Sequence, residues 1–127
     1  MAFGKVKTEN REALLFGLPG NPVAATVSFL FFVKNALLKM MGAQIEPPQA
    51  IAALAKAPIR KKTGRTEFQR GIVNLADGQF TVSLTGNQGS GVIQSLTDAN
   101  CIIYLPEDQG MVKAGDRVMV YMLDELL

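Results

Sequence analysis

A long apolar segment, Val23–Met41, places the strongest constraint on what this chain can fold into. Lys34 and Lys39 are its only charged residues. Asn21 before the segment can cap a helix, and Pro22 suits the first helical position because its missing N–H donor costs nothing there. Gly42 after it favours the left-handed conformation that ends many helices. The sequence therefore predicts one helix of roughly 30 Å, from 1.5 Å per residue, with apolar side chains almost all round.

A helix of this kind is normally buried on several sides, so the residues that could cover it matter. Two short apolar runs precede it, Met1–Val6 and Leu14–Leu18, and they are expected to form two strands, paired as a hairpin. The second run is apolar on both faces, which indicates a strand covered on both sides. Two short strands cannot bury the helix. Residues 1–43 are therefore expected to be the end of a larger α/β domain; the alternative is a helix packed on a second copy of the chain.

The pattern changes after the linker-like stretch Ala43–Gln49, which contains two adjacent prolines and marks an expected domain boundary. Beyond it, apolar residues recur with the period of two that is typical of strands, and glycine-containing turns separate them. Residues 44–127 are expected to form a small β-barrel domain, so the fold class is mostly β with one long helix. The expected strands are Ala50–Ala57, Thr66–Asn74, Gln79–Thr85, Cys101–Leu105 and Arg117–Leu123.

Composition excludes several classes of protein. A net charge of +2, with scattered basic residues, gives no reason to expect nucleic acid as a partner. The absence of histidine rules out Cys-His catalysis and His-based metal sites, and the single cysteine, Cys101, reads as a small buried apolar residue. The spacing of the acidic residues does not suggest a metal site.

The strongly apolar stretch Val23–Val33 is too short to span a bilayer, and no signal peptide is visible, so a cytoplasmic location and no membrane partner are expected. The basic residues around Lys61 are expected to be a solvated turn, comprising Arg60, Lys61, Lys62 and Arg65.

Two turns could bind an anion. The first, with Pro19, Gly20, Asn21 and Pro22, runs from a strand into a helix N-terminus, where unpaired N–H groups and the helix dipole favour negative charge; a plain capping turn is the alternative. The second is the glycine-rich segment 86–91. Its glycines, Gly89 among them, allow N–H groups to converge, and Ser90 adds a hydroxyl donor; an ordinary hairpin connection is the alternative.

Arg70 is the most unusual charged residue, because it lies within an expected strand. Alternation places it on the same face as Phe68 and Ile72, where a guanidinium needs an oxyanion partner. That partner is either a carboxylate of the protein or a ligand such as molybdate or phosphate. The neighbouring Gly71 permits a close approach of backbone.

Three sequence motifs together resemble one family. LFGLPGNPVAATVSF, TGRTEFQRGIV and LTGNQGSGVIQSLTDANCIIYLPED, in this order, are similar to the closing third of molybdopterin molybdenumtransferases of the MoeA and gephyrin E-domain type. The resemblance implies an activity that transfers molybdate into adenylylated molybdopterin and releases molybdenum cofactor and AMP. It also implies a homodimer, with the cleft between the α/β domain of one subunit and the C-terminal domain of its partner.

The resemblance assigns roles by position. Arg70 and Ser90 match catalytic cleft residues associated with binding of molybdate, and the turn Pro19–Pro22 and Gly89 match substrate-binding positions. The divalent cation, Mg²⁺, is expected to have its ligands upstream, outside this chain. Ala24 departs from the serine that the family often has there. Alone, the chain is expected to be inactive as a transferase; a stand-alone oxyanion-binding module and a dimerisation module are the alternatives.

Overall fold

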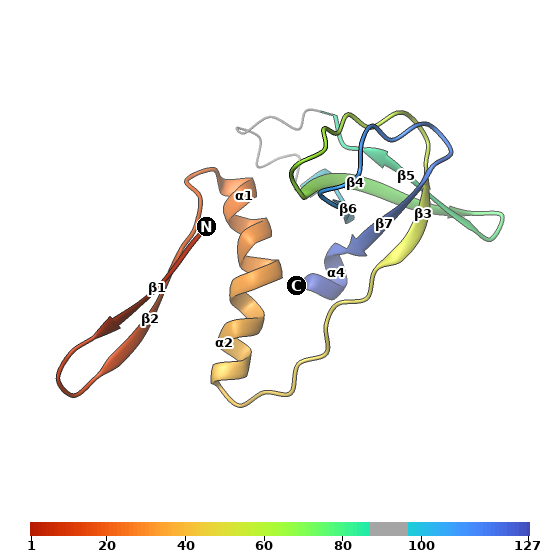
Figure 1. The fold of residues 1–127 in the computed structure, drawn as a ribbon. Helices are drawn as coiled ribbons and strands as arrows, with labels where there is room; N and C mark the ends of the chain where they lie inside the picture. The colour runs from red at the N-terminus through yellow and green to blue at the C-terminus, as the bar shows by residue number, and fades with distance from the viewer. Residues whose placement is uncertain (87–96) are drawn as a thin grey trace. The chain divides into compact units, whose positions relative to one another are not determined.

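The computed structural model describes residues 1–86 and 97–127, and the chain divides into two compact units, Met1–Glu46 and Pro47–Leu127. The first unit contains a hairpin and a helical rod, and the second contains a barrel of short strands (Figure 1). The mostly β fold class with one long helix is therefore confirmed.

The first two strands, β1 (Ala2–Lys7) and β2 (Glu12–Gly17), form the predicted antiparallel hairpin. Phe3 and Phe16 face each other across it, with ring centroids 5.2 Å apart. The expectation that β2 is covered on both sides is not met by the residues that the structure describes. Leu15 is 59% exposed and Phe3 is 65% exposed. Side chains project to the two faces of a ribbon, and a paired strand covers neither face, so these apolar side chains stay exposed.

The predicted helix is present and is made of three consecutive segments: α1 (Pro22–Ser28), the π-helical turn η1 (Phe29–Val33) and α2 (Lys34–Met40). Its end follows the glycine rule closely. Gly42 has a φ of +81°, its amide donates to the carbonyl of Lys39, and the amide of Ala43 donates to that of Leu38. These two bonds satisfy carbonyls that a helix end would otherwise leave open. The π-helical turn was not predicted.

The helix extends beyond Val23–Val33, the apolar stretch that is too short to span a bilayer. Pro22–Met40 has 19 residues and is, by length and composition alone, able to cross a membrane; it is the one such helix in the described parts of the chain. Helices of protein interiors satisfy the same criteria, so this property by itself does not indicate a membrane protein.

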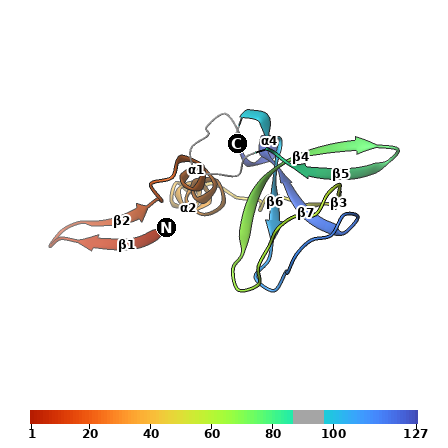
Figure 2. The same ribbon diagram turned by 90° about the horizontal axis from the view of Figure 1, so that it is seen from above.

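The second unit is a closed barrel, as predicted, with strand order β3-β5-β4-β6-β7 (Figure 2). Most neighbours are antiparallel, but β3 and β5 pair in parallel, which closes the barrel. A short helix, α4 (Leu123–Leu126), follows the last strand. The strands are β3 (Ile51–Ala55), β4 (Glu67–Ala76), β5 (Gln79–Leu84), β6 (Cys101–Leu105) and β7 (Arg117–Met122).

The barrel core consists of small and β-branched side chains that interdigitate closely. Gly71 shows how closely: a Cβ atom at this position would lie 2.9 Å from Cδ1 of Ile103 and 3.1 Å from the carbonyl oxygen of Ser83. The close backbone approach predicted for Gly71 is confirmed. The fully buried side chains include Ile59, Val82, Ile103, Leu105, Val112 and Val120.

The side chain of Asn100 bonds to the backbone of β4 just beyond the last residue that pairs with β6. Its Oδ1 accepts from the amide of Val73 at 2.8 Å, and its Nδ2 donates to the carbonyl of Val73 at 2.9 Å. One side-chain amide thus replaces the strand neighbour that Val73 lacks on this side. The backbone of Asn100 also bonds the carbonyl of Gly71 and the amide of Leu123, so it joins β4 to the end of β7.

Candidate functional site

Arg70 is buried on the barrel wall, with 2% of its surface exposed. It belongs to the central part of β4, where Val73 points into the core and Gly71 contacts Ile103. Strand alternation therefore places the side chain of Arg70 on the opposite, outer face of the wall, together with Phe68 and Ile72, as the sequence indicates. Burial makes this guanidinium a strong electrostatic group, because the surrounding medium screens its charge less than water does.

A row of residues runs across four neighbouring strands at the level of Arg70. Arg70 is registered with Ile102 on β6, and Ile102 is registered with Tyr121 on β7. On the other side, the amide of Thr85 donates to the carbonyl of Arg70 at 3.2 Å. Ile102 and Thr85 are 0% and 3% exposed. The carbonyl of Arg70 is thus held from the β5 side, and the register with Ile102 aligns Arg70 with β6. A side chain mounted on such a strand is positioned more sharply than one on a loop.

Aromatic rings occupy the same face next to this row. The rings of Phe68 and Tyr104 lie 5.6 Å apart, and those of Tyr104 and Tyr121 lie 6.3 Å apart in an edge-on arrangement. Such pairs stabilise a face beyond the area that they bury. The outer face of β4, β6 and β7 therefore combines one buried cation with an aromatic surface.

The turn at Pro19–Pro22 is a well-formed capping turn. Oδ1 of Asn21 accepts from the amides of Val23 and Ala24 at 2.9 and 3.4 Å, and the backbone carbonyl of Asn21 accepts from Ala25. Pro22 has no N–H to offer. The expectation of unpaired donors at this helix end is therefore wrong, because the Asn21 side chain already occupies them. Any attraction of an anion here would come from the helix dipole.

The remaining candidate positions lie either outside the described residues or in the first unit. Gly89 and Ser90 lie outside the described residues. The turn Pro19–Pro22 belongs to the first unit, whereas Arg70 belongs to the second. The sharing of one oxyanion by these positions stays a prediction.

Two other sequence candidates have structural roles. Lys61 is 7% exposed, and its Nζ donates to the carbonyls of Lys62 and Gln109. The prediction of a solvated turn is therefore wrong for Lys61, whose ammonium group links its own loop to the loop that contains Gln109. Arg60, Lys62 and Arg65 are exposed. Cys101 is fully buried, as predicted, and burial raises the pKa of its thiol to about 11. A thiol of that kind stays protonated and unreactive near neutral pH.

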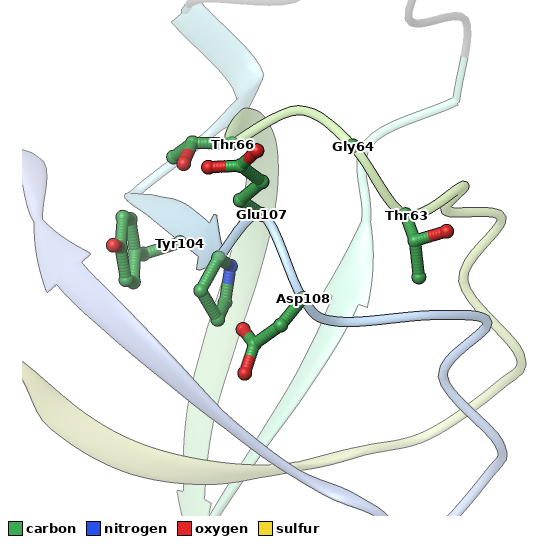
Figure 3. Close-up of a pocket in the computed structure, with 7 residues that line it drawn as sticks. Thr63, Gly64, Thr66, Tyr104, Glu107 and Asp108 are labelled. Carbon is green, nitrogen blue, oxygen red and sulfur yellow. The ribbon is translucent and has the colours of Figure 1, made fainter.

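A pocket at the end of β6 is lined by none of the candidate site residues that the structure describes. Tyr104, Pro106, Glu107 and Asp108 line it, and Figure 3 shows the ring of Tyr104 and the carboxylates of Glu107 and Asp108. Thr63, Gly64 and Thr66 complete the lining, and the amide of Gly64 donates to the carbonyl of Glu107 at 2.9 Å. Two further pockets flank the same loop and the strand that follows it. Arg70 lines none of the three.

The acidic residues do not form a metal centre where the chain is described. No group of three or more His, Cys, Asp or Glu side chains converges there in a way that could hold an ion. The described residues therefore do not fit the divalent cation that the family resemblance implies.

Comparison with known proteins agrees with this architecture. The family model for the MoeA C-terminal region, domain IV, matches residues 52–123. The chain is 37% identical to a molybdopterin molybdenumtransferase of Haemophilus influenzae, an alignment that covers 99% of this chain and 31% of that protein. A protein of the same name from Staphylococcus aureus is 36% identical, over 87% of this chain and 26% of that protein. The chain thus spans about a third of the curated relatives that it matches.

Solved structures give the same result. A molybdopterin biosynthesis MoeA protein of Pyrococcus horikoshii superposes with a TM-score of 0.65 at 32% identity, covering 81% of this chain and 26% of that one. A molybdenum cofactor biosynthesis protein of Pyrococcus furiosus superposes with a TM-score of 0.64 at 34% identity, covering 81% of this chain and 36% of that one. The chain therefore belongs to the MoeA family, and its barrel is that family's C-terminal region.

Proposed function

We propose that this chain is the C-terminal part of an enzyme that inserts molybdate into adenylylated molybdopterin and releases molybdenum cofactor and AMP. The observation that carries the proposal is Arg70, a cation buried at 2% exposure on the wall of a barrel of the MoeA C-terminal type. The names of the relatives, molybdopterin molybdenumtransferases, support the reaction.

The role assigned to Arg70 is electrostatic. Molybdate is a small dianion, and a guanidinium offers two parallel N–H donors to a pair of its oxygens. A donor that is already fixed and desolvated needs little reorganisation when the anion arrives. Arg70 would therefore hold molybdate in the orientation that its reaction with the dithiolene sulfurs of molybdopterin requires.

The other parts of the site belong to the same proposal. Gly89 and Ser90 would add donors to the anion, and the turn Pro19–Pro22 would contact the pterin substrate. A homodimer would place the C-terminal barrel of one subunit at the α/β domain of its partner, and the exposed apolar side chains of the first unit, such as Phe32 and Met40, support contact with further protein. Mg²⁺ would be bound by residues outside this chain, and the enzyme would work in the cytoplasm.

The test is a charge deletion in the whole enzyme that carries these residues. Arg70→Met removes the guanidinium but keeps much of the side-chain volume, and Arg70→Lys keeps the charge without the two-donor geometry. A hydrogen bond to a charged group contributes about 1.5–3 kcal/mol, so Arg70→Met should raise the molybdate concentration for half-maximal cofactor formation about 10- to 100-fold. Arg70→Lys should need a molybdate concentration between that of the unsubstituted enzyme and that of Arg70→Met. Arg65→Met, at an exposed loop position, is the matched control.

The proposal is refuted if Arg70→Met forms cofactor with the molybdate dependence of the unsubstituted enzyme. The chain alone offers a second test, of the stand-alone oxyanion module. One arginine should not hold a hydrated dianion tightly, so calorimetry of the 127-residue chain with molybdate should show no binding below the millimolar range. Submillimolar binding would favour the stand-alone module instead.

A further inference from the structure

Thr85 stands directly opposite Arg70, one residue beyond the end of β5. The register of β4 and β5 pairs Gly71 with Leu84, and the bond from the amide of Thr85 to the carbonyl of Arg70 continues that register by one step. Opposed residues of an antiparallel pair project to the same face. The side chains of Thr85 and Arg70 therefore lie on the same side of the barrel wall, and both are almost fully buried, at 3% and 2% exposure.

The hydroxyl of Thr85 adds a second donor to the same acceptor. Its Oγ1 lies 3.4 Å from the carbonyl oxygen of Arg70, which already accepts from the amide of Thr85. A carbonyl oxygen has two lone pairs, so one residue supplies both donors. Packing alone does not explain a hydroxyl here, because valine has the same shape and avoids the cost of burying a polar group. The hydroxyl must therefore contribute through its bonds.

We propose that Thr85 is a positioning residue for molybdate, acting through Arg70; this inference rests on the function proposed above. Thr85 fixes the peptide unit of Arg70 from the β5 side, while the carbonyl of the next residue, Gly71, accepts from the amide of Asn100 beside β6. The guanidinium at the far end of a long side chain depends on that fixed backbone for its direction. A small change in that direction weakens the bonds that the guanidinium can make to molybdate, because hydrogen bonds weaken steeply as their geometry departs from the optimum.

The test compares two substitutions of Thr85 in the whole enzyme. Thr85→Val removes the hydroxyl and keeps the shape, whereas Thr85→Ser keeps the hydroxyl. A neutral hydrogen bond contributes about 0.5–1.5 kcal/mol, so Thr85→Val should raise the KM for molybdate about three- to tenfold. Its kcat at saturating molybdate should stay within about twofold, and Thr85→Ser should restore the KM. Thr81→Val is the matched control, because Thr81 lies on the same strand and face, opposite Asn74.

The results separate the positioning role from a structural one. An unchanged KM in Thr85→Val overturns the inference. So does an equal defect in Thr85→Ser, or a loss of kcat that accompanies a lower melting temperature without a change in KM. If Thr85→Val does not fold, Thr85→Ala removes the same hydroxyl with less crowding, and the same comparison with Thr85→Ser decides. Arg70→Met, measured in parallel, keeps the two failures apart: a normal KM there removes the proposed function, whereas a raised KM there with a normal KM in Thr85→Val removes only the inference about Thr85.

Discussion

Replacing Gly71 by a larger residue should destabilise the barrel, because the surrounding core atoms leave too little room for a side chain. A methyl group at this position would lie 2.9 Å and 3.0 Å from Cδ1 and Cγ1 of Ile103, and 3.1 Å from the carbonyl oxygen of Ser83. Ordinary contacts between carbon atoms are about 3.5–4.0 Å long. Two of the three obstacles belong to a fully buried side chain and the third to strand backbone, so none can move away freely.

The expected loss of stability follows from these contacts. Overpacking of a core typically costs about 1–3 kcal/mol, and replacing glycine by alanine returns about 0.4–1 kcal/mol by restricting the unfolded chain. Gly71→Ala should therefore destabilise the barrel by about 1–2 kcal/mol. For a domain of 60–100 residues, each kcal/mol lowers the melting temperature by about 4–8 °C. Urea and thermal denaturation of the 127-residue chain, followed by far-ultraviolet circular dichroism, measure both quantities.

A double-mutant cycle identifies the clash. Ile103→Val removes the Cδ1 atom that lies nearest to the added methyl group, so the double variant should be more stable than the sum of the two single losses by at least about 0.5 kcal/mol. Gly86→Ala is the control, because a Cβ there meets none of the described residues within 4 Å and its φ lies outside the left-handed region. The packing argument is refuted if Gly71→Ala is as stable as this control, or if its cost does not change when Ile103 is shortened.

Two further predictions concern polar groups of the barrel. Asn100→Ala should destabilise the chain by about 1–3 kcal/mol, because the amide and carbonyl of Val73 both lose their partner; Asn100→Asp, which keeps only the acceptor, should be intermediate in urea denaturation, and equal stability of all three proteins would contradict this role. Cys101 should make stability fall between about pH 9 and 11, because burial raises the pKa of its thiol from 9.0 to about 11 in the folded state. Above pH 9 the unfolded thiol loses its proton while the buried one keeps it, so unfolding is favoured as the pH rises. Compared with Cys101→Ala across this range, the chain should lose on the order of 2 kcal/mol; parallel curves would disprove the linkage.

The ends of the helix could be predicted from the sequence because they depend on local chemistry. Asn21 accepts from the first amides, Pro22 lacks the donor that would be wasted, and Gly42 adopts the left-handed conformation that stops the helix. The π-helical turn at Phe29–Val33 could not be predicted. It differs from an α-helix by one residue in the span of each hydrogen bond, and no residue type in this apolar run selects one span over the other.

In the barrel too, features that depend on local sequence could be predicted, and features that depend on distant residues could not. Alternation of apolar residues and glycine turns predicted all five strands, with ends within two residues of those in the structure. The parallel pairing of β3 with β5 and the double bond from Asn100 to Val73 were not predicted. Both join residues that are about 27 positions apart, and neither leaves a periodic trace in the sequence.

The two anion-friendly features of the sequence differ in the structure, and the difference bears on the mechanism. At the helix start the amides that could bind an anion are already bonded to Asn21, so this end supplies a dipole without free donors. Arg70 carries a permanent charge, and the carbonyls of Arg70 and Gly71 on this strand accept bonds from the two sides. If both features contact substrate, the helix start suits a group that is positioned by shape and weak attraction. Arg70 suits a dianion that must be held in one orientation. In the proposed function, discrimination between molybdate and other tetrahedral dianions would therefore depend on residues of the barrel wall.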